Sequence, residues 1–460
     1  MKVNGIIAEY NPFHKGHLYQ LAESRHLTGA DYTIVVMSGD FVQRGAPAML
    51  DKHVRTRMAL MGGADLVLEL PLLYAVSSAE QFAAGAVALL DRLGTVTHLC
   101  FGSECGDPDV LGRIAGYLQE EPDSYRSDLQ RLLRQGHSYP AARAQALHAA
   151  LAEDCARILS SPNNILGIDY IKALQKRKSP ITPVTIKRIG SGYHDCELQH
   201  ATQQISDTSA TQQHRLQQTS ATSAAQQTSD TSAQKRHDLR HNLDSLAASS
   251  APPSSARAIR QALQSGMFPE QLRPYLPEGT AQLLEDCFSA KKYVHTADFS
   301  SILYYKLLTQ KEQGYESYLD VSVSLSERIR NKLGEFTGWE SFCDIMKTKD
   351  VTYTRVSRCL LHILLDIEKA HLDLALSLDY APYARMLGFR RSAAPLLGAI
   401  KSHSSIPLLS KLAHAQNILS AEADRMLRQD IFASDVYQGI LSGRTGLPPQ
   451  NELAAPLVIL

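Results

Sequence analysis

The stretch "VNGIIAEYNPFHKGH", residues 3–17, decides the fold of this chain. Its first part, Val3–Ala8, is a short apolar run that predicts a buried β-strand, and the Asn-Pro pair after it is a turn signal. A helical pattern of apolar residues follows from about His17 to Leu27. A buried strand that leads directly into a helix begins a βαβ unit, so this stretch predicts an α/β fold.

The alternation of strands and helices continues through the first part of the chain. Apolar runs bounded by Gly or Pro predict further buried strands, with helical patterns between them. Such strands are typical of a parallel sheet covered on both faces, so we expect a doubly wound, Rossmann-like sheet that binds ligands at the carboxyl ends of its strands. The expected strands are Tyr32–Met37, Asp65–Leu70, Thr97–Gly102 and Pro183–Ile189, and the expected helices are Lys52–Met61, Ala79–Leu93 and several within 108–157.

The composition changes abruptly after this part. Residues 199–253 are dominated by Gln, Ser, Thr and Ala, which bury too little apolar area to offset the entropy of ordering, so a disordered, low-complexity insertion is predicted. From residue 268 onward strands vanish and helical periodicity dominates. We therefore expect an α/β domain at 1–198, completed by 254–267 after the insertion, and an all-α C-terminal domain at 268–460.

The length, the charge and the cysteine content of the chain limit the kinds of protein that it could be. The 460 residues suffice for two or three domains, and Lys+Arg and Asp+Glu both number 47, so a nucleic-acid partner must be held by local patches. No signal peptide is evident, and no apolar stretch reaches the roughly 20 residues that span a bilayer. The seven cysteines are scattered, which is typical of reduced thiols. We expect a cytoplasmic protein without a membrane partner.

Two histidines follow the first strand, where ligands of such sheets bind. His14, Gly16 and His17 open the helix, whose free N–H groups and partial positive charge suit phosphate. Glycine lets the backbone approach a ligand, and imidazoles donate hydrogen bonds to oxygens where charge builds. A metal pair, a proton relay and a helix cap are the alternatives. No acidic residue or cysteine lies at a sequence spacing typical of a third metal ligand, so no metal site is expected.

Two short motifs in the sequence resemble the signatures of a known superfamily. "HKGH" resembles the H-x-G-H signature of the nucleotidyltransferase superfamily, and "SSARAIR" (254–260) is similar to its second signature, I-S-S-T-x-I-R. The resemblance implies that His14 and His17 contact ATP phosphates and that Ser255 and Arg260 hold the β- and γ-phosphates. Position 257 is Arg where Thr is usual.

A wider set of motifs resembles one family within that superfamily. "GIIAEYNPFHKGHL", "MSGDFVQRGAPA", "GADLVLELP", "FGSE", "PNNILGIDYIKAL" and "IKRIGSGYHD" occur in the order typical of the tRNA(Met) cytidine acetate ligase family. The similarity runs from residue 5 to about 196, resumes at 254 and continues more weakly in "KTKDVTYTRVSR" and "MLGF". The insertion, and Lys15 where Asn is common, depart from the family pattern.

This resemblance implies a reaction. Acetate would be activated with ATP, accompanied by Mg²⁺, as acetyl-adenylate, and the acetyl group would pass to N4 of the wobble cytidine of elongator tRNA(Met). No obligate protein partner is expected. The alternatives are an adenylyltransferase of coenzyme biosynthesis, which shares the histidine signature, and a non-catalytic RNA-binding protein that keeps the nucleotide fold as a scaffold.

The expected nucleotide site gathers around the first strand and its helix. Structural roles would also explain several of these residues. A tight turn would account for Gly102 and a helix cap for Asn163, and Lys187 and Arg188 would be an exposed pair of charges at a strand end. Asn164 is the second candidate, after Asn163, for the amide that contacts ATP. The expected ATP-binding residues are Ile7, Ala8, Glu9, Tyr10, Asn11, Pro12, Phe13, His14, Lys15, Gly16, His17, Leu18, Tyr19, Gln20, Gly102, Asn163, Lys187, Arg188, Ser255 and Arg260.

Further polar residues are expected to serve acetate, catalysis or tRNA. Asp40 follows the second strand and could hold Mg²⁺ through water or position the acceptor amine, and Arg44 could receive the acetate carboxylate. Solvated loop charges are the alternative for both. Cations at a helix start are unfavourable for its dipole, which hints at binding by Lys52 and Arg55. The preferred candidates for tRNA contact are Arg44, Lys52, Arg55, Lys347, Lys349, Tyr353, Arg355 and Arg358. The basic segments "QKRK" (175–178) and "GFRR" (388–391) are less favoured candidates.

Overall fold

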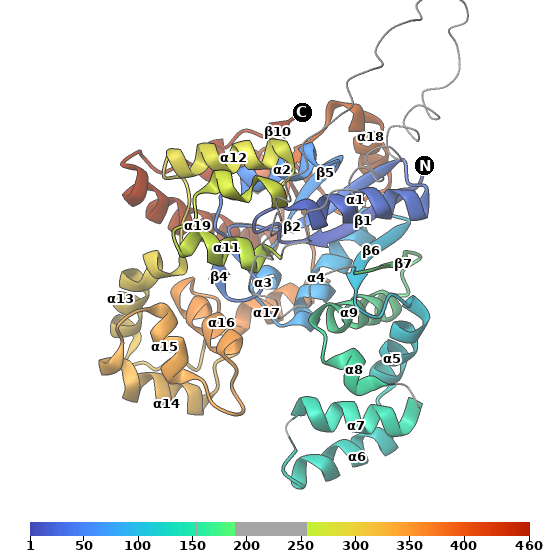
Figure 1. Cartoon of the computed structure of the whole chain (residues 1–460), viewed down its shortest axis with the longest axis vertical. Helices are drawn as coiled ribbons and strands as arrows, with labels where there is room; N and C mark the ends of the chain where they lie inside the picture. The colour runs from blue at the N-terminus through green and yellow to red at the C-terminus, as the bar shows by residue number, and fades with distance from the viewer. Residues whose placement is uncertain (138, 152–153, 189–254) are drawn as a thin grey trace, which may run out of the picture.

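The computed structural model describes residues 1–137, 139–151, 154–188 and 255–460 (Figure 1). The insertion predicted at 199–253 lies outside the described residues, as does Ser254 of the second signature. The domain boundaries proposed from the sequence therefore stay a prediction, and the fold is described for the two long segments on either side.

A mostly parallel sheet forms the centre of the molecule, in the order β10-β8-β5-β2-β1-β6-β7, where β8 is Ala384–Phe389 and β10 is Val458–Ile459. The strand β1 lies in its middle, parallel to β2 on one side and to β6 on the other, and β5 and β7 extend the parallel part outward. The doubly wound α/β prediction is confirmed. The strands are β1 (Val3–Ala8), β2 (Tyr32–Ser38), β5 (Leu66–Leu70), β6 (His98–Ser103) and β7 (Thr182–Lys187).

Helices cover both faces of the sheet. On one face Leu21, Met58 and Leu284 share a core with Ile6 of β1. On the other face Leu90 packs against the backbone of β1 so closely that a Cβ at Gly5 would lie 2.8 Å from its methyl group. The first face carries α1 (Lys15–Thr28), α2 (Lys52–Met61), α11 (Ala256–Gln264) and α12 (Glu278–Ser289), and the second α4 (Ala79–Arg92), α5 (Pro108–Glu120) and α9 (Pro162–Arg177).

The C-terminal part is mainly helical, as expected, but the expectation that strands vanish after residue 268 is wrong. β8 (Ala384–Phe389) joins the central sheet antiparallel to β5, and β9 (Leu408–Leu409) and β10 (Val458–Ile459) pair parallel with β8. β8 is stabilised by pairing with β5, more than 300 positions away in the sequence, and the two-residue strands β9 and β10 are stabilised by pairing with β8, so local periodicity does not reveal them. The end of the chain thus returns to the N-terminal sheet.

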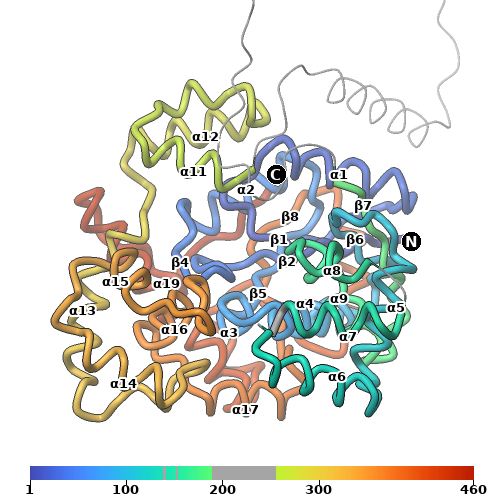
Figure 2. The backbone as a smooth tube through the Cα atoms, turned by 60° about the horizontal axis from the view of Figure 1, so that its bottom comes forward, coloured from blue at the N-terminus to red at the C-terminus, as the bar shows by residue number. Residues whose placement is uncertain are grey.

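Two groups stand out among the remaining helices in Figures 1 and 2. One group follows β6, and a second, α13–α16, lies beside the short hairpin of β3 (Phe41–Val42) and β4 (Ala46–Pro47). The other helices are α3 (Leu72–Ala75), α6 (Asp123–Arg134), α7 (Tyr139–Leu151), α8 (Cys155–Leu159), α13 (Ser300–Gln310), α14 (Val323–Lys332), α15 (Trp339–Met346), α16 (Tyr353–Leu364), α17 (Lys369–Ser377), α18 (Ala394–His403) and α19 (Ala421–Thr445).

The tip of the β3–β4 hairpin is fixed against α16. Ser357 Oγ donates a hydrogen bond to the carbonyl oxygen of Gly45 at 2.7 Å and accepts one from Trp339 Nε1 at 3.1 Å. Gly45 has a φ of +73°, and a Cβ there would overlap the backbone of Ser357 and Arg358. The hairpin, which the sequence suggested as a plain loop, therefore joins the sheet to the helical group.

Replacing this glycine tests the joint. Gly45→Ala is expected to destabilise the protein by about 1–3 kcal/mol, because the left-handed backbone is strained for alanine and the neighbouring backbone cannot move aside. Thermal unfolding followed by circular dichroism measures the change. Gly112→Ala is the matched control: it lies inside α5 with open space around it and should stabilise the helix slightly. Equal behaviour of the two variants would contradict the joint.

Candidate active site

The loop between β1 and α1 is held in place from three sides. Arg55 Nη1 donates to the carbonyl oxygen of Glu9 at 2.7 Å, and the backbone N–H of Gln43 donates to Glu9 Oε1 at 2.9 Å. The N–H of Met49 donates to Asn11 Oδ1 at 2.8 Å. The loop is therefore rigid at the carboxyl end of β1, where ligands of doubly wound sheets bind.

The predicted nucleotide-contacting residues of this loop differ in exposure. Tyr10, Asn11, Pro12 and Phe13 are buried, and the rings of Tyr10 and Phe13 meet edge to face at 4.9 Å between centroids. The Tyr10 ring also lies against the His17 ring at 4.8 Å. The buried Tyr10 ring thus packs against both Phe13 and His17. The half-buried members of the predicted set are Ile7, Ala8, Glu9, His14, Lys15, Gly16, His17, Leu18, Tyr19 and Gln20.

Both histidines cap the first helix, one of the alternatives that the sequence left open. His14 Nδ1 accepts a hydrogen bond from the N–H of Gly16 at 3.0 Å, and His17 Nδ1 accepts one from the N–H of His14 at 3.3 Å. The rings stack 3.8 Å apart. A Cβ at Gly16 would lie 2.8 Å from the His14 ring, so the glycine is needed for this packing.

The cap leaves each ring with one donor. Because Nδ1 accepts in both, the proton of each neutral imidazole lies on Nε2. Burial, followed by the charges of Arg188 and Arg260, lowers the pKa of His14 to about 3. Burial, His14 and Arg188 also lower the pKa of His17 well below its usual value. At neutral pH the pair therefore offers two uncharged Nε2–H donors side by side.

Two arginines, Arg188 and Arg260, act on this pair, and Arg44 and Arg257 act on Arg260 in turn. Burial, Arg44 and Arg257 lower the pKa of Arg260 to about 10, and Glu9 opposes the effect. The pKa of Arg44 is lowered by burial and by Arg257, again against Glu9. Arg188 acts on both histidines. Cations from α11, β7 and the hairpin thus gather at one end of β1, which favours the binding of a multiply charged anion.

The second signature lies at the N-terminus of α11. Ser255 Oγ accepts a hydrogen bond from the N–H of Ala258 at 3.1 Å and so caps the helix. Arg260 donates to the carbonyl oxygen of Asn11 in the β1–α1 loop. The two signatures, about 240 residues apart in sequence, are therefore in direct contact.

The opposite rim of the site is organised by a residue that sequence reasoning did not single out. Glu104 Oε1 accepts a hydrogen bond from Asn163 Nδ2 at 2.6 Å, and it lies 3.6 Å from Arg188 Nε. Lys187 and Arg188 are exposed at the end of β7, as predicted. The "FGSE" motif contained the signal for Glu104, but no spacing rule connects it with Asn163 or Arg188.

Of two other candidates on this rim, Asn164 has a structural role, whereas the ATP contact of Gly102 stays a prediction. Asn164 is buried, accepts from the N–H of Cys105 and donates to the carbonyl oxygen of Ile158. A Cβ at Gly102 would lie 3.5 Å from the Arg188 side chain, an ordinary contact. Of the two neighbouring amides, Asn163 is the one left at the site.

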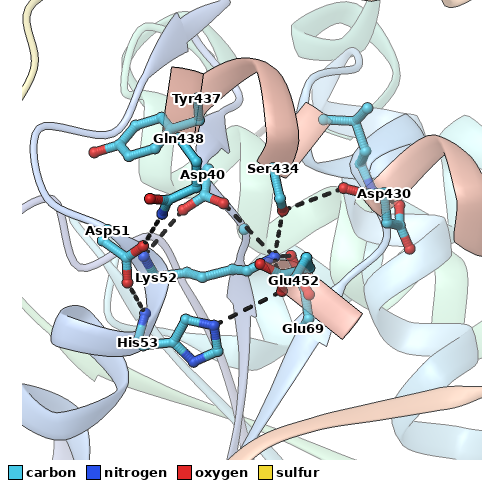
Figure 3. A network of polar contacts seen from close by, with 12 residues as sticks. Asp40, Asp51, Lys52, His53, Glu69, Asp430, Ser434, Tyr437, Gln438 and Glu452 are labelled. Carbon is cyan, nitrogen blue, oxygen red and sulfur yellow. Dashed lines mark hydrogen bonds and ion pairs between the residues drawn. The ribbon is translucent and has the colours of Figure 1, made fainter. Parts of the chain in front are cut away.

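The prediction that Lys52 and Arg55 reach phosphate or tRNA is wrong, because both are completely buried. Lys52 Nζ lies 2.9 Å from both Glu69 and Glu452, and 2.6 Å from Ser434 Oγ (Figure 3). Arg55 donates to backbone carbonyl oxygens of the β1 and β2 ends and of residue 50. Buried acceptors, rather than a ligand, explain these cations at a helix start.

Asp40 belongs to the same buried network, with 3% of its surface exposed. Its Oδ1 accepts from the N–H of Lys52 at 3.0 Å, and its Oδ2 lies 3.6 Å from Lys52 Nζ. Burial raises the pKa of Asp40 to about 6, against the lowering by Lys52. Because this carboxyl is buried and bonded to Lys52, neither the predicted contact with Mg²⁺ through water nor the positioning of the acceptor amine fits its position.

The tRNA candidates of the helical part divide by exposure. Lys347, Lys349, Tyr353 and Arg355 are exposed on the loop before α16 and on its first turn, whereas Arg358 is half-buried. The competing segments have structural partners: Arg177 of "QKRK" binds Asp379 and Asp91, and Arg390 of "GFRR" binds the carbonyl oxygen of Leu60.

The described part of the chain has neither a membrane-spanning helix nor a cluster of metal-ligating side chains. None of its helices is long and apolar enough to cross a membrane. Among the same residues, no group of three or more His, Cys, Asp or Glu side chains could hold a metal ion.

Comparison with known proteins now decides the family. The family model described as HIGH Nucleotidyl Transferase matches residues 1–247 and 232–446. A tRNA(Met) cytidine acetate ligase from Acetivibrio thermocellus is 38% identical over 440 residues, which cover 95% of this chain and 94% of the relative. The chain belongs to the tRNA(Met) cytidine acetate ligase family. Another member, from Clostridium kluyveri, is 36% identical over 467 residues, covering 100% of this chain and 99% of the relative.

Solved structures agree with this assignment. Thermotoga maritima TmcAL bound with alpha-thio ATP has a TM-score of 0.80 and 28% identity, and the apo form I of that protein has a TM-score of 0.83 and 27% identity. Both comparisons cover 100% of each chain. The resemblance and the fold class predicted from the sequence are confirmed, and this family member is a ligase-type nucleotidyltransferase.

Proposed function

We propose that the chain activates acetate with ATP as acetyl-adenylate, releases pyrophosphate, and transfers the acetyl group to N4 of the wobble cytidine of elongator tRNA(Met). The family assignment supports the reaction class. The observation that carries the proposal for the site is the pair of neutral Nε2–H donors of His14 and His17 at one end of β1, with arginines acting on it. With tRNA as the substrate, the cytoplasm is the proposed compartment.

The chemistry asks for alignment and charge stabilisation rather than for a protein nucleophile. An acetate oxygen attacks the α-phosphorus of ATP, the bond to the β-phosphate bridging oxygen breaks, and pyrophosphate leaves with the electron pair. Two Nε2–H donors suit the α-phosphate oxygens on which charge builds, because neutral donors add no repulsion among the neighbouring arginines. We propose that Mg²⁺ enters with the triphosphate as part of the substrate.

The second step transfers the acetyl group. The cytidine N4 amine attacks the acetyl carbonyl carbon, the bond to the phosphate oxygen breaks and AMP leaves, while the amine releases one proton. We propose Arg44 as the partner of the acetate carboxylate, since it is half-buried on the hairpin beside Glu9 and Arg257. Asn163, positioned by Glu104, and Arg188 are proposed contacts of the nucleotide on the opposite rim.

The hairpin suggests where tRNA meets this site. Its tip is bonded to α16, so Arg44 and the exposed cations at the start of α16 lie on one connected unit. Lys347, Lys349 and Arg355 could bind backbone phosphates, and the exposed Tyr353 ring offers a surface for base stacking. We propose 268–460 as the tRNA-binding domain, with Arg358 supporting this edge, and 1–198 with 254–267 as the nucleotide-binding domain.

A charge-removal variant tests the tRNA surface. Combining Lys347→Ala, Lys349→Ala and Arg355→Ala should weaken tRNA binding and reduce the slope of log affinity against log salt by about 2–3, since each lost phosphate contact contributes about 0.7–0.9. Acetate-dependent pyrophosphate exchange should stay unchanged. The control combines Lys401→Ala, Lys411→Ala and Arg425→Ala, three exposed cations elsewhere. An equal loss in both triple variants would refute a specific surface.

Exchange of labelled pyrophosphate into ATP tests the activation step. The wild-type chain should catalyse exchange with acetate and be nearly inactive without it. Exchange that requires a phosphorylated coenzyme precursor in place of acetate would assign the chain to coenzyme biosynthesis. Absence of exchange with any acid would leave only a scaffold that binds RNA.

A further inference from the structure

The position that departs from the second signature is Arg257, at the start of α11. Ser255 is the N-cap, so Arg257 occupies the first turn of the helix and lies three residues before Arg260. Residues three apart share a helix face. Because Arg260 bonds the β1–α1 loop through Asn11, Arg257 stands on the face of α11 that borders the nucleotide site.

Arg257 has no counter-ion among the described residues. Among the residues that the structure describes, the exposed Arg257 side chain takes part in no ion pair and no side-chain hydrogen bond. Its charge instead acts on two other cations, Arg44 of the hairpin and Arg260 of its own helix, and Glu9 is the carboxylate that opposes them.

The helix itself adds to this excess of positive charge. A cation in the first turn of a helix faces the positive end of the helix dipole, which is unfavourable unless an anion binds there. The charges of Arg44, Arg257 and Arg260 thus act on one another near the N-terminus of α11, and Arg260 also acts on His14. Such a concentration of charge suits a group that carries several negative charges close together.

The exposures of these groups suggest an order along the triphosphate. The histidines are half-buried, next to the end of β1, and are uncharged. Arg257 lies further out, at the exposed end of the cluster. Neutral donors suit the phosphate that reacts, whereas charged donors suit the pyrophosphate that gains negative charge as it leaves.

We propose that Arg257 binds the β- and γ-phosphates of ATP, and the pyrophosphate formed from them. This inference rests on the proposed function, because it assumes that the anion at the site is a nucleoside triphosphate. A hydroxyl at this position would offer one neutral donor, whereas the guanidinium offers a charged, forked donor. Binding of the leaving group is therefore stronger in this chain, and more dependent on salt, than a hydroxyl would allow.

Calorimetric titration of the full chain with AMP, ATP and pyrophosphate tests the assignment. Arg257→Ala should weaken ATP and pyrophosphate binding about 10- to 100-fold, the usual cost of one charged hydrogen-bonding group, and change AMP binding less than about twofold. Arg257→Lys should fall between, because it keeps the charge and loses the fork. The control is Arg157→Ala, an exposed arginine on α8 whose partner Asp154 is also exposed; it should change none of the three.

The outcomes separate this inference from the proposed function. Unchanged ATP and pyrophosphate binding in Arg257→Ala, or an equal loss for AMP, would overturn the inference. A wild-type chain that binds ATP no more tightly than AMP would overturn it too. The titrations need no acetate, so if wild-type exchange with acetate fails while the Arg257-dependent preference for ATP persists, the proposed function falls and the phosphate role of Arg257 stands.

Discussion

His17→Asn is expected to lower acetate-dependent pyrophosphate exchange by about 100-fold or more while leaving the fold intact, since removing one preorganised donor to a developing charge costs about 10²–10³ in rate. The asparagine Oδ1 can take the place of Nδ1 and accept the N–H of His14, but it leaves nothing at the position of Nε2. The variant thus separates the two roles of this ring.

A second substitution at the same position provides the comparison. His17→Ala removes the capping acceptor as well, so it should lose the same activity and in addition about 1 kcal/mol of stability. Exchange rates and thermal unfolding measure the two effects. Exchange within about threefold of wild type in His17→Asn would mean that the ring serves only as a cap.

Lys52→Met is expected to destabilise the protein by about 3–5 kcal/mol, because it leaves buried carboxylates without their shared cation. Figure 3 shows Lys52 between Glu69 of β5, Ser434 of α19 and Glu452 of the short turn at Glu452–Ala454. Arg385 of β8 contacts the same two glutamates. The network therefore joins the N-terminal sheet to the last elements of the chain.

Urea unfolding followed by circular dichroism and by the fluorescence of Trp339, the single tryptophan, measures this loss. The deficit should be smaller at pH 5 than at pH 8, because protons neutralise the carboxylates that Lys52 no longer balances. Lys172→Met is the matched control. Its pair with Glu80 is partly exposed, so it should cost less than about 1 kcal/mol. A loss below about 1 kcal/mol in Lys52→Met would contradict the structural role of the network.

The parallel part of the fold was predictable because its signals are local. The strands at Val3–Ala8 and Thr97–Gly102 are apolar runs buried on both faces, and the structure places them within one residue of the prediction. The place of the histidine pair was predictable for a similar reason, because ligands of such sheets bind at the ends of buried strands. The structure shows its capping role, and its phosphate role stays a prediction.

Other features depend on contacts that no local pattern contains. β8 becomes a strand only by pairing with β5. Lys52 is buried because it pairs with carboxylates such as Glu452, which lies 400 residues later in the sequence. A lysine at a helix start has the same sequence pattern whether it faces solvent or a buried carboxylate. Glu104 was missed because its partners, Asn163 and Arg188, come from two later elements.

The full reaction tests the central claim most directly. The wild-type chain is incubated with ATP, labelled acetate and unmodified elongator tRNA(Met), and the digested RNA is analysed by mass spectrometry. A matched tRNA with uridine at the wobble position is the control. We predict N4-acetylcytidine at the wobble position, formed with one AMP and one pyrophosphate per acetyl group, and none in the control. An active, acetate-dependent exchange without any N4-acetylcytidine, or acetylation of the control tRNA, would contradict the account.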